Sequence, residues 1–349
     1  MVAWMIGDGQ WGSTGKGLLA AHLAQTWEPD TVINNFGPNA GHTWISEEGE
    51  KVVVKQLPMG IVSPSVRRVM IGPGSIVDPE LLQKELYAFD KYLIGKELII
   101  HERAAACLPE HKDTERNSLA SISSTFQGTG AALACKVLRK TNGIMGDYDG
   151  LRRFYVDTPT WLELLGEGRR VQIESAQGLE LGLNSGSHYP YCTSRDISPQ
   201  QVMADVLWPY RQKFLSIVVM RTFPIRVGDQ FDDNGVKVGT SGPVYPDQKE
   251  ISWKDLGVED ERTTVTNKIR RVFTWSWQNC EKVRQIWAPD FVFLNFMNYM
   301  DPKAKGSHDM KAECWSFISQ VEKNCGPVRW LGFGPKSSNI SELGNGNKP

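Results

Sequence analysis

A glycine-rich turn near the N-terminus constrains the fold of this chain most strongly. The stretch IGDGQWGSTGKG spans residues 6–17, follows the apolar run Val2–Ile6 and precedes Gly15–Gln25, which is apolar at helical spacing. A strand, a glycine-rich turn and a helix form the geometry in which backbone N–H groups receive a phosphate. The common P-loop requires Ser or Thr where this chain has Gly17. We therefore predict a different phosphate loop with Lys16 as its cation; the alternative is a glycine-rich turn with a solvated lysine.

Short apolar runs alternate with helical patterns along the rest of the chain. Strands are predicted at Thr31–Asn34, Val66–Ile71, Leu98–His101, Val171–Glu174, Ser216–Met220, Phe291–Asn295 and Val328–Leu331. Asp78 is a predicted N-cap of a helix that continues to about Tyr92, and Asp309–Asn324 is predicted as another helix. This alternation predicts an α/β fold with a large, mostly parallel central sheet, flanking helices and inserted loops that carry the site.

Composition excludes several kinds of partner. The chain has 39 Lys and Arg against 40 Asp and Glu, so we expect neither a nucleic-acid polymer nor an anionic membrane as a partner. It shows no basic leader and no apolar run near the ~20 residues of a membrane span. The six cysteines lack CxxC spacing and are predicted to be free thiols in the cytoplasm. We expect residues 1–340 to form a single domain and residues 341–349 to form a polar tail.

A second glycine-rich stretch, NNFGPNAGHT, spans residues 34–43 and follows a predicted strand. A histidine in such a loop can reach into a cleft, and its charge near pH 7 suits a general acid or a phosphate partner. His42 is therefore a candidate site residue. The alternative is a structural histidine.

These two loops resemble those of one enzyme family, adenylosuccinate synthetase. QWGSTGKG is similar to the family's QWGDEGKG, and NAGHT is identical to its second loop. Five further stretches agree with family motifs in the same order: STFQGTGAALACKVLRK (124–140), ESAQG (174–178), YPYCTS (189–194), TVTNKIRR (264–271) and GFGP (332–335). The similarity extends from residue 3 to about residue 340 and implies an adenylosuccinate-synthetase-like fold.

The resemblance implies a carbon–nitrogen ligase. The family joins the amine of aspartate to C6 of a 6-oxopurine nucleotide with a nucleoside triphosphate. Because oxide is a poor leaving group, O6 is phosphorylated first, and the aspartate amine then displaces phosphate. His42 is implied as a donor to O6 and the γ-phosphoryl group, and Mg²⁺ is implied as the cofactor that neutralises charge there.

The chain departs from the family at Ser13, where the family has an aspartate that removes the N1 proton of the purine. Serine is a very weak base, but its short neutral side chain leaves space and a hydrogen-bond partner beside C2. Guanine carries an amino group at C2, so the change favours dGMP as the acceptor. The acceptor of the N1 proton stays open among Asp8, a water relayed by Ser13, and the substrate phosphate.

Two further departures concern the other ligands. Residues 294–298 read LNFMN where the family selects guanine with a carboxylate. Because an amide both donates and accepts, Asn298 and Asn295 favour ATP or dATP, unless they only end a strand. Lys268 replaces a family arginine, which could accommodate a changed sugar.

The resemblance also implies the residues of each subsite. Ser13 and His42 are the implied catalytic residues, and Ser13 and Gly41 the implied metal contacts. The triphosphate subsite comprises Ser13, Thr14, Gly15, Lys16, Gly17, Gly41, His42, Thr43, Asn295, Asn298, Gly334 and Pro335. The dGMP subsite comprises Ser13, Asn39, Ala40, Ser124, Thr125, Arg139, Gln177, Thr193 and Lys268. The aspartate subsite comprises Thr264, Val265, Thr266, Asn267, Lys268 and Arg270, with Arg270 as its main cation. Arg139 reaches the nucleotide of a neighbouring subunit, which implies a homodimer.

These departures resemble a bacteriophage branch of the family that joins dGMP to L-aspartate for 2-aminoadenine DNA precursors, which implies the cytoplasm of a host cell. Three alternatives stay open. The chain could be an ordinary adenylosuccinate synthetase acting on IMP, or a non-catalytic nucleotide-binding relic that has lost the aspartate. A P-loop kinase or GTPase is disfavoured by Gln10 and Gly17 and by the absence of a guanine-reading NKxD stretch.

Overall fold

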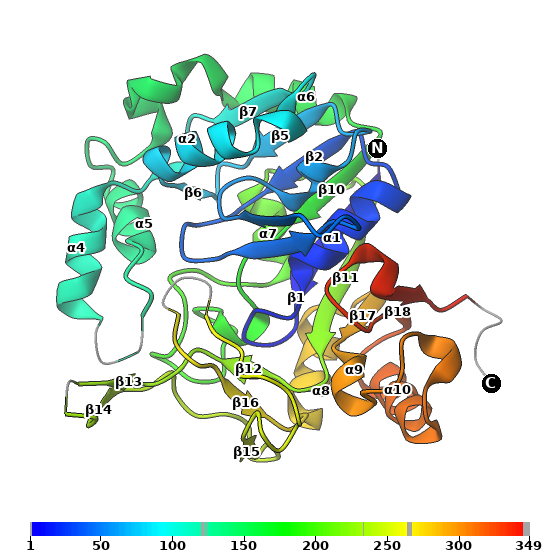
Figure 1. Ribbon diagram of the computed structural model, residues 1–349. Coiled ribbons are helices and arrows are strands. Elements are labelled where there is room, and N and C mark those ends of the chain that lie inside the picture. Colours follow the sequence, from blue (N-terminus) through cyan, green and yellow to red (C-terminus); the bar gives the residue numbers. More distant parts are fainter. Residues whose placement is uncertain (1, 120–121, 123, 233, 264–266, 345–349) are drawn as a thin grey trace.

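The computed structural model describes residues 2–119, 122, 124–232, 234–263 and 267–344. Within these residues a ten-stranded sheet has the order β19-β18-β17-β11-β1-β10-β2-β5-β7-β9, with β1 near its centre (Figure 1). Its strands are β1 (Val2–Asp8), β2 (Thr31–Asn34), β5 (Arg68–Ile71), β7 (Glu97–His101), β9 (Tyr155–Val156), β10 (Arg170–Glu174), β11 (Phe214–Arg221), β17 (Phe291–Asn295), β18 (Val328–Gly332) and β19 (Ile340–Glu342). Every pairing is parallel except that of β19 with β18. The predicted mostly parallel sheet is therefore confirmed. The eight strands predicted from the sequence, counting Val2–Ile6, all lie in it.

The helices flank this sheet. They are α1 (Lys16–Thr26), α2 (Pro79–Ala88), α3 (Asp90–Leu93), α4 (Pro109–Ser118), α5 (Thr129–Val137), α6 (Thr158–Glu167), α7 (Pro199–Asp205), α8 (Trp277–Ile286), α9 (Met297–Met300) and α10 (Ala312–Asn324). Asp78 caps α2 by accepting from the N–H of Leu81, as predicted. The helix predicted to reach Tyr92 is interrupted, because Phe89 has a non-helical backbone between α2 and α3.

Two further boundaries differ from the sequence prediction. Asp309 does not begin α10, because its carboxylate accepts from the N–H groups of Lys305 and Gly306 and closes a separate turn. The boundary predicted after residue 340 is also wrong. Ser341 and Glu342 continue β19, and Leu343 is buried against the core.

Alternate residues of the strands point into two hydrophobic cores, one on each face of the sheet. In β1, Met5 belongs to the core that contains side chains of α6, α7, α8 and α10, whereas Ile6 belongs to the core that contains side chains of α1 and α2. The apolar runs of the parallel strands are thus explained by burial on both faces. The six cysteines are free, as predicted; Cys107, Cys280, Cys314 and Cys325 are buried.

Smaller sheets extend from the central one. They are the antiparallel pair β3 (His42–Ile45) and β4 (Lys51–Val54), the parallel pair β6 (Ile76–Val77) and β8 (Ala105–Ala106), the pair β13 (Gln230–Phe231) and β14 (Lys237–Gly239), and a three-stranded sheet of β12 (Ile225–Arg226), β16 (Arg271–Phe273) and β15 (Glu250–Ile251). In Figure 1, α4 and α5 lie at the left of the central sheet and the β12–β16–β15 sheet lies below it. The loops that follow β1, β2, β10, β17 and β18, the segments on either side of α5 and the segment before β16 carry the predicted site residues.

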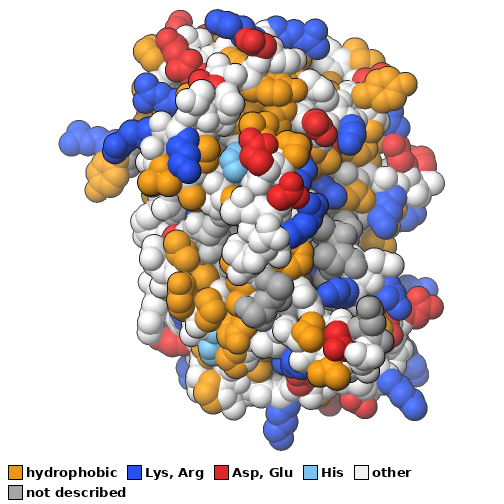
Figure 2. Space-filling view, turned by 90° about the vertical axis from the view of Figure 1, so that its left-hand side faces the viewer, with side chains coloured by type: hydrophobic (Ala, Val, Ile, Leu, Met, Phe, Trp, Pro, Cys, Tyr) orange, Lys and Arg blue, Asp and Glu red, His pale blue; other side chains and the backbone are white. Residues whose placement is uncertain are grey.

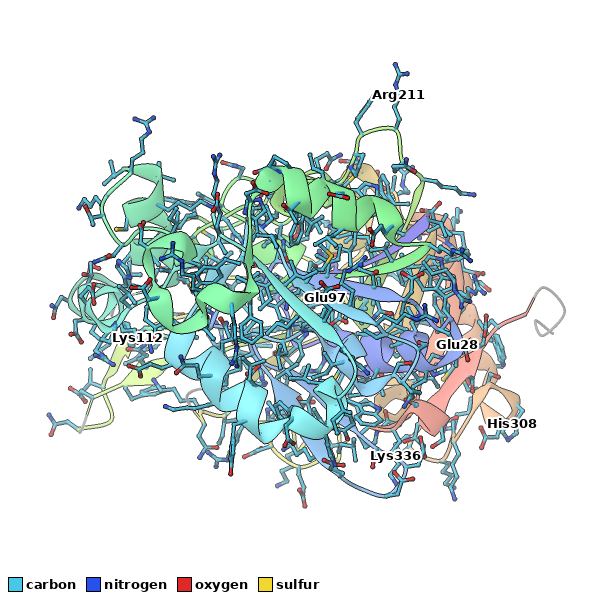
Figure 3. All side chains as sticks on the ribbon, turned by 90° about the horizontal axis from the view of Figure 1, so that it is seen from above. Glu28, Glu97, Lys112, Arg211, His308 and Lys336 are labelled. Carbon is cyan, nitrogen blue, oxygen red and sulfur yellow. The ribbon has the colours of Figure 1, made fainter. Side chains whose placement is uncertain are left out.

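Charged side chains of both signs are distributed over the surface. On the face in Figure 2, basic and acidic groups are interspersed. Seen from above, Lys112 lies at the end of the molecule opposite His308, and Arg211 extends outward from a loop (Figure 3). No helix in the described part of the chain is both long and apolar enough to span a membrane.

Candidate active site

A cavity of about 990 Å³ gathers most of the predicted site residues. It is lined by segments that are far apart in sequence and meet at the loop after β1. The predicted residues that line it are Ser13, Thr14, Gly15, Lys16, Gly17, Asn39, Ala40, Gly41, His42, Thr43, Ser124, Thr125, Gln177, Thr193, Arg270, Asn295, Asn298, Gly334 and Pro335. Pieces of all the predicted subsites therefore share one space.

Several predicted residues lie elsewhere. Arg139 follows α5, is exposed and does not line the cavity. Asn267 and Lys268 lie beside the cavity but do not line it. Thr264, Val265 and Thr266 fall outside the described residues.

The glycines of the first loop are required by close packing. Gly15 has a φ of 102°, and a Cβ there would lie 2.1 Å from Nδ2 of Asn295. A Cβ at Gly17 would lie 2.8 Å from the backbone N and O of Thr43. This contact explains why the Ser or Thr of the common P-loop is absent: the start of α1 packs directly on β3. The N-terminus of α1 has no side-chain cap and no acidic residue in its first turn, so its N–H groups suit an anion.

Asp8 fixes the conformation of the loop after β1 through hydrogen bonds. Its carboxylate is 0% exposed and accepts from Lys16 Nζ at 2.8 Å, from Thr14 Oγ1 at 2.5 Å and from the N–H of Gln10 at 2.8 Å. Lys16 Nζ also donates to the Gln177 carbonyl at 2.8 Å. One ammonium hydrogen of Lys16 is left for a ligand. Asp8 does not line the cavity, so the geometry disfavours it as the acceptor of the N1 proton.

Asp8→Asn should destabilise the unliganded protein by about 3 kcal/mol, since removing one partner leaves the charge of Lys16 buried and unpaired. A bound triphosphate supplies negative charge to that ammonium. We therefore expect a non-hydrolysable ATP analogue to stabilise the variant more than the wild type. Urea unfolding with and without the analogue measures both effects.

The matched control is Asp78→Asn. Asp78 is also buried and accepts from a lysine, Lys112, at 2.6 Å, but neither residue lines the cavity. This variant should be destabilised without any extra rescue by the analogue. Equal stabilisation of wild type and Asp8→Asn by the analogue would contradict the assigned role of Asp8.

His42 is the first residue of β3 and is held flat against Phe36. The two rings are stacked with centroids 4.1 Å apart and planes 6° apart, and His42 is 5% exposed. Burial, reinforced by the charge of Lys16, lowers the pKa of His42 to about 3. The imidazole is therefore neutral near pH 7 and has one N–H that can donate to an oxygen.

Ser13 presents its side chain to the cavity from a left-handed backbone position, with φ 54°. Its carbonyl accepts from Arg221 Nη1 at 3.2 Å. Elsewhere on the wall, Asn39 Nδ2 donates to Thr193 Oγ1 at 3.5 Å. The second and fifth motifs of the sequence thus meet across one pocket, as expected for residues that hold one nucleotide.

The carboxylates that line the described part of the cavity are both engaged. Glu115 accepts from the N–H groups of Gly128 and Gly130, each at 2.7 Å. Glu261 forms a bidentate pair with Arg221 at 2.6 and 3.0 Å. Burial raises the pKa of the Glu261 carboxyl, but the charge and hydrogen bonds of Arg221 outweigh burial and lower it overall. Neither carboxylate is arranged as a free base.

The two asparagines of the base-reading segment differ in their surroundings. Asn295 donates to the Thr14 carbonyl at 2.9 Å and accepts from the N–H of Phe296 at 2.8 Å, so it fastens the loop to the end of β17. Asn298 lines the cavity, and its buried Oδ1 has no hydrogen-bond partner among the described residues. Asn298 is therefore the better placed of the two to accept from the amino group of adenine.

Arg270, predicted as the main cation of the aspartate subsite, lines the cavity. Its Nε donates to the Arg262 carbonyl at 3.2 Å, and the Arg270 carbonyl accepts from Trp253 Nε1 at 2.8 Å. Burial lowers the pKa of Arg270 to about 10, so it still carries its charge near pH 7. The backbone is thus fixed while the guanidinium keeps donors for a carboxylate.

The sequence analysis missed several cavity residues. They are Trp11, Glu115, Arg226, Glu261 and Tyr299. Trp11 lies within the first motif and could have been included. The others lie in segments without a phosphate-loop pattern, and Arg226 and Glu261 belong to the part of the chain between Met220 and Phe291, where no strand or helix was predicted.

Known proteins are similar to this chain over almost its whole length. A sequence model of adenylosuccinate synthetase matches residues 5–148. The N6-succino-2-amino-2'-deoxyadenylate synthase of Salmonella phage PMBT28 is 40% identical over 97% of this chain and 96% of its own length. The adenylosuccinate synthetase of Thermococcus sibiricus is 30% identical, with 98% and 99% covered.

The chain belongs to the adenylosuccinate synthetase family. Among solved structures, the cyanophage S-2L succinoaminodeoxyadenylate synthetase, bound to dGMP and to dATP as an energy donor, matches with a TM-score of 0.87 and 36% identity over 97% of this chain and 95% of that one. The Plasmodium falciparum adenylosuccinate synthetase matches with a TM-score of 0.81 at 19% identity, covering 98% and 99%, and supports the fold. The predicted family and fold are therefore confirmed, and the chain is a ligase of this family.

Proposed function

We propose that this enzyme joins L-aspartate to C6 of dGMP with ATP or dATP, giving 2-amino-2'-deoxy-N6-succinyladenylate, ADP or dADP, and phosphate. The observation that carries the proposal is the full-length similarity to phage synthases, one of which binds dGMP and dATP. The neutral side chain of Ser13 in the cavity supports it, because it leaves room beside C2 for the amino group of guanine.

In the first step, O6 of dGMP attacks the γ-phosphorus, the bond from that phosphorus to the β–γ bridging oxygen breaks, and the N1 proton leaves. The N–H groups at the start of α1 and Lys16 hold the phosphates in line. His42, neutral and fixed by Phe36, donates to O6 and the γ-phosphoryl oxygens as charge develops there. Because the lining carboxylates are engaged, we infer that the N1 proton leaves through water at Ser13 or to the transferring phosphate.

In the second step, the neutral aspartate amine attacks C6, the C6–O6 bond breaks, and the departing phosphate takes the proton that the amine loses. Arg270 holds the carboxylates of aspartate so that its amine faces C6, which makes the attack effectively intramolecular. Asn39, Thr125, Gln177 and Thr193 hold the acceptor nucleotide. Asn298 reads the adenine of the donor.

The residues present fit a magnesium ion held mainly by the nucleotide. Mg²⁺ prefers oxygen ligands and is commonly bound through substrate phosphates. The Ser13 hydroxyl and the Gly41 carbonyl are the oxygen donors that we propose from the protein. When bound, the ion neutralises negative charge on the phosphates.

We further propose a homodimer that works in the cytoplasm of a host cell. The exposed position of Arg139 supports the dimer, because that residue is free to reach the cavity of a second copy. The phage origin of the similar synthases supports the location.

The test is phosphate release from the purified protein with Mg²⁺, ATP and aspartate, comparing dGMP with IMP and omitting each component in turn. Release that requires both dGMP and aspartate, with little from IMP, is the expected result. Release with IMP instead would establish ordinary adenylosuccinate synthesis. No release with either acceptor would favour a nucleotide-binding protein without catalysis.

A further inference from the structure

Arg221 lies where three segments of the cavity wall meet, although it does not line the cavity itself. It is the last residue of β11 and is 0% exposed. The three segments are the loop after β1, the residues Glu261 and Arg270, which are joined by a backbone hydrogen bond, and the segment after β17. In the proposed function the three segments bind different ligands. The first binds the phosphates and the acceptor base, the second binds aspartate, and the third binds the base of the donor.

The first contact is with the loop after β1. Arg221 Nη1 donates to the Ser13 carbonyl at 3.2 Å. The backbone of Arg221 also pairs with the side-chain amide of Gln10, donating to Oε1 at 3.0 Å and accepting from Nε2 at 3.1 Å. One residue thus holds both the start of the loop and its tip at Ser13.

The second contact is with the residues proposed to position aspartate. The guanidinium of Arg221 donates two hydrogen bonds, of 2.6 and 3.0 Å, to the Glu261 carboxylate. The backbone carbonyl of Glu261 accepts from the N–H of Arg270 at 2.8 Å. The position of the cation proposed for aspartate is therefore tied to Arg221 through one intervening residue.

The third contact is with the segment that reads the donor base. The guanidinium of Arg221 stacks over the ring of Phe296 at 3.9 Å. Tyr299 donates its hydroxyl to Glu261 at 2.9 Å. Phe296 and Tyr299 flank Asn298 in sequence, so the same ion pair also fixes the residue proposed to contact adenine.

We propose that Arg221 is a positioning residue that couples the binding of the triphosphate, the acceptor and aspartate. This inference rests on the proposed assignment of the three segments to their ligands. The planar guanidinium makes all these contacts in one geometry, which a lysine ammonium cannot reproduce. A ligand that orders one segment therefore stabilises, through Arg221, the positions in which the other two segments bind their ligands. Each ligand then raises the affinity for the others by the same factor as they raise its own.

The experiment uses Arg221→Lys and Glu261→Gln in the full chain. The affinity of a non-hydrolysable ATP analogue with Mg²⁺ is measured alone and with dGMP and aspartate, and the KM for aspartate is measured separately. In the wild type we expect the two ligands to tighten analogue binding by about 5-fold or more, within the usual range of such coupling. In both variants this ratio should approach 1, and the KM for aspartate should rise about 10-fold or more.

The matched control is Arg329→Lys. Arg329 also stacks on aromatic rings, with Phe291 at 4.7 Å, and pairs with a glutamate, Glu342, at 2.9 Å, but it lies outside the cavity wall. Its variant should keep the wild-type coupling ratio and aspartate KM. Tyr299→Phe, which removes only the hydroxyl bond to Glu261, replaces Arg221→Lys if that variant fails to fold.

The outcomes separate this inference from the proposed function. If wild type uses IMP and not dGMP, the proposed function fails, and the same coupling ratio is measured with IMP. Wild-type coupling and aspartate KM in both variants would overturn the inference. A loss of kcat alone, with the coupling ratio and KM unchanged, would overturn it too, because it would show general damage to the site.

Discussion

His42→Asn should lower kcat by about 10²-fold or more while changing the KM values much less. The reason is that His42 is held as a neutral donor, buried and stacked on Phe36, where charge develops on O6 and the transferring phosphoryl group. Loss of a positioned acid or of one such donor has about this cost. Steady-state phosphate release with dGMP, ATP and aspartate measures the effect.

The control for this variant is His101→Asn. His101 is also fully buried, and its pKa is lowered to about 4 by burial and by nearby cations, but it contacts Trp161 and Thr158 of α6 and does not line the cavity. Its variant should keep kcat within about 2-fold, as expected for a residue away from the chemistry. A rate near that of wild type for His42→Asn would leave that histidine with a structural role only.

The pH dependence of the unfolding free energy provides a second test of the neutral imidazole of His42. Because the pKa of His42 falls from 6.5 to about 3 on folding, the unfolded chain binds a proton between these values and the folded chain does not. Its contribution is therefore complete above pH 6.5 and is lost as the pH falls towards 3. In this window the unfolding free energy of wild type should decrease more steeply than that of His42→Asn, by up to about 1.4 kcal/mol per pH unit.

Ser13→Asp should reverse the preference for the acceptor nucleotide. The longer, charged side chain enters the space proposed for the 2-amino group, and overpacking of this kind costs about 1–3 kcal/mol. We therefore expect kcat/KM for dGMP to fall by about 10- to 100-fold, while kcat/KM for IMP rises because a base returns beside N1. Parallel assays with the two acceptors give the ratio directly.

Ser13→Ala is the matched control, since it removes the hydroxyl without adding volume or charge. It should weaken dGMP use through loss of a hydrogen bond, with no gain for IMP. An unchanged ratio of the two kcat/KM values in Ser13→Asp would remove Ser13 as the residue that selects the acceptor.

The sequence predicted most of the sheet and the central part of the site. Strands such as Phe291–Asn295 are continuous apolar runs because both faces of a parallel sheet are buried, and that pattern is local. The first loop was predictable for the same reason: a strand, glycines and a helix that bind phosphate are neighbours in sequence. The resemblance then added residues as distant as Thr193 and Pro335, and the cavity places them together.

What only the tertiary structure decided is how each residue is used. Asp8 stood in the sequence as a possible base, yet folding turns its carboxylate towards Lys16 and Thr14 and away from the cavity. Asn295 was predicted to contact the base of the donor, but in the fold its side-chain amide donates to the Thr14 carbonyl of the first loop. Arg221 and Glu261 carried no local signal, because the two residues that form this ion pair lie 40 positions apart in the sequence. Local hydrophobic patterns determine strands and helices, whereas hydrogen-bond partners of buried polar groups depend on contacts that exist only once the chain is packed.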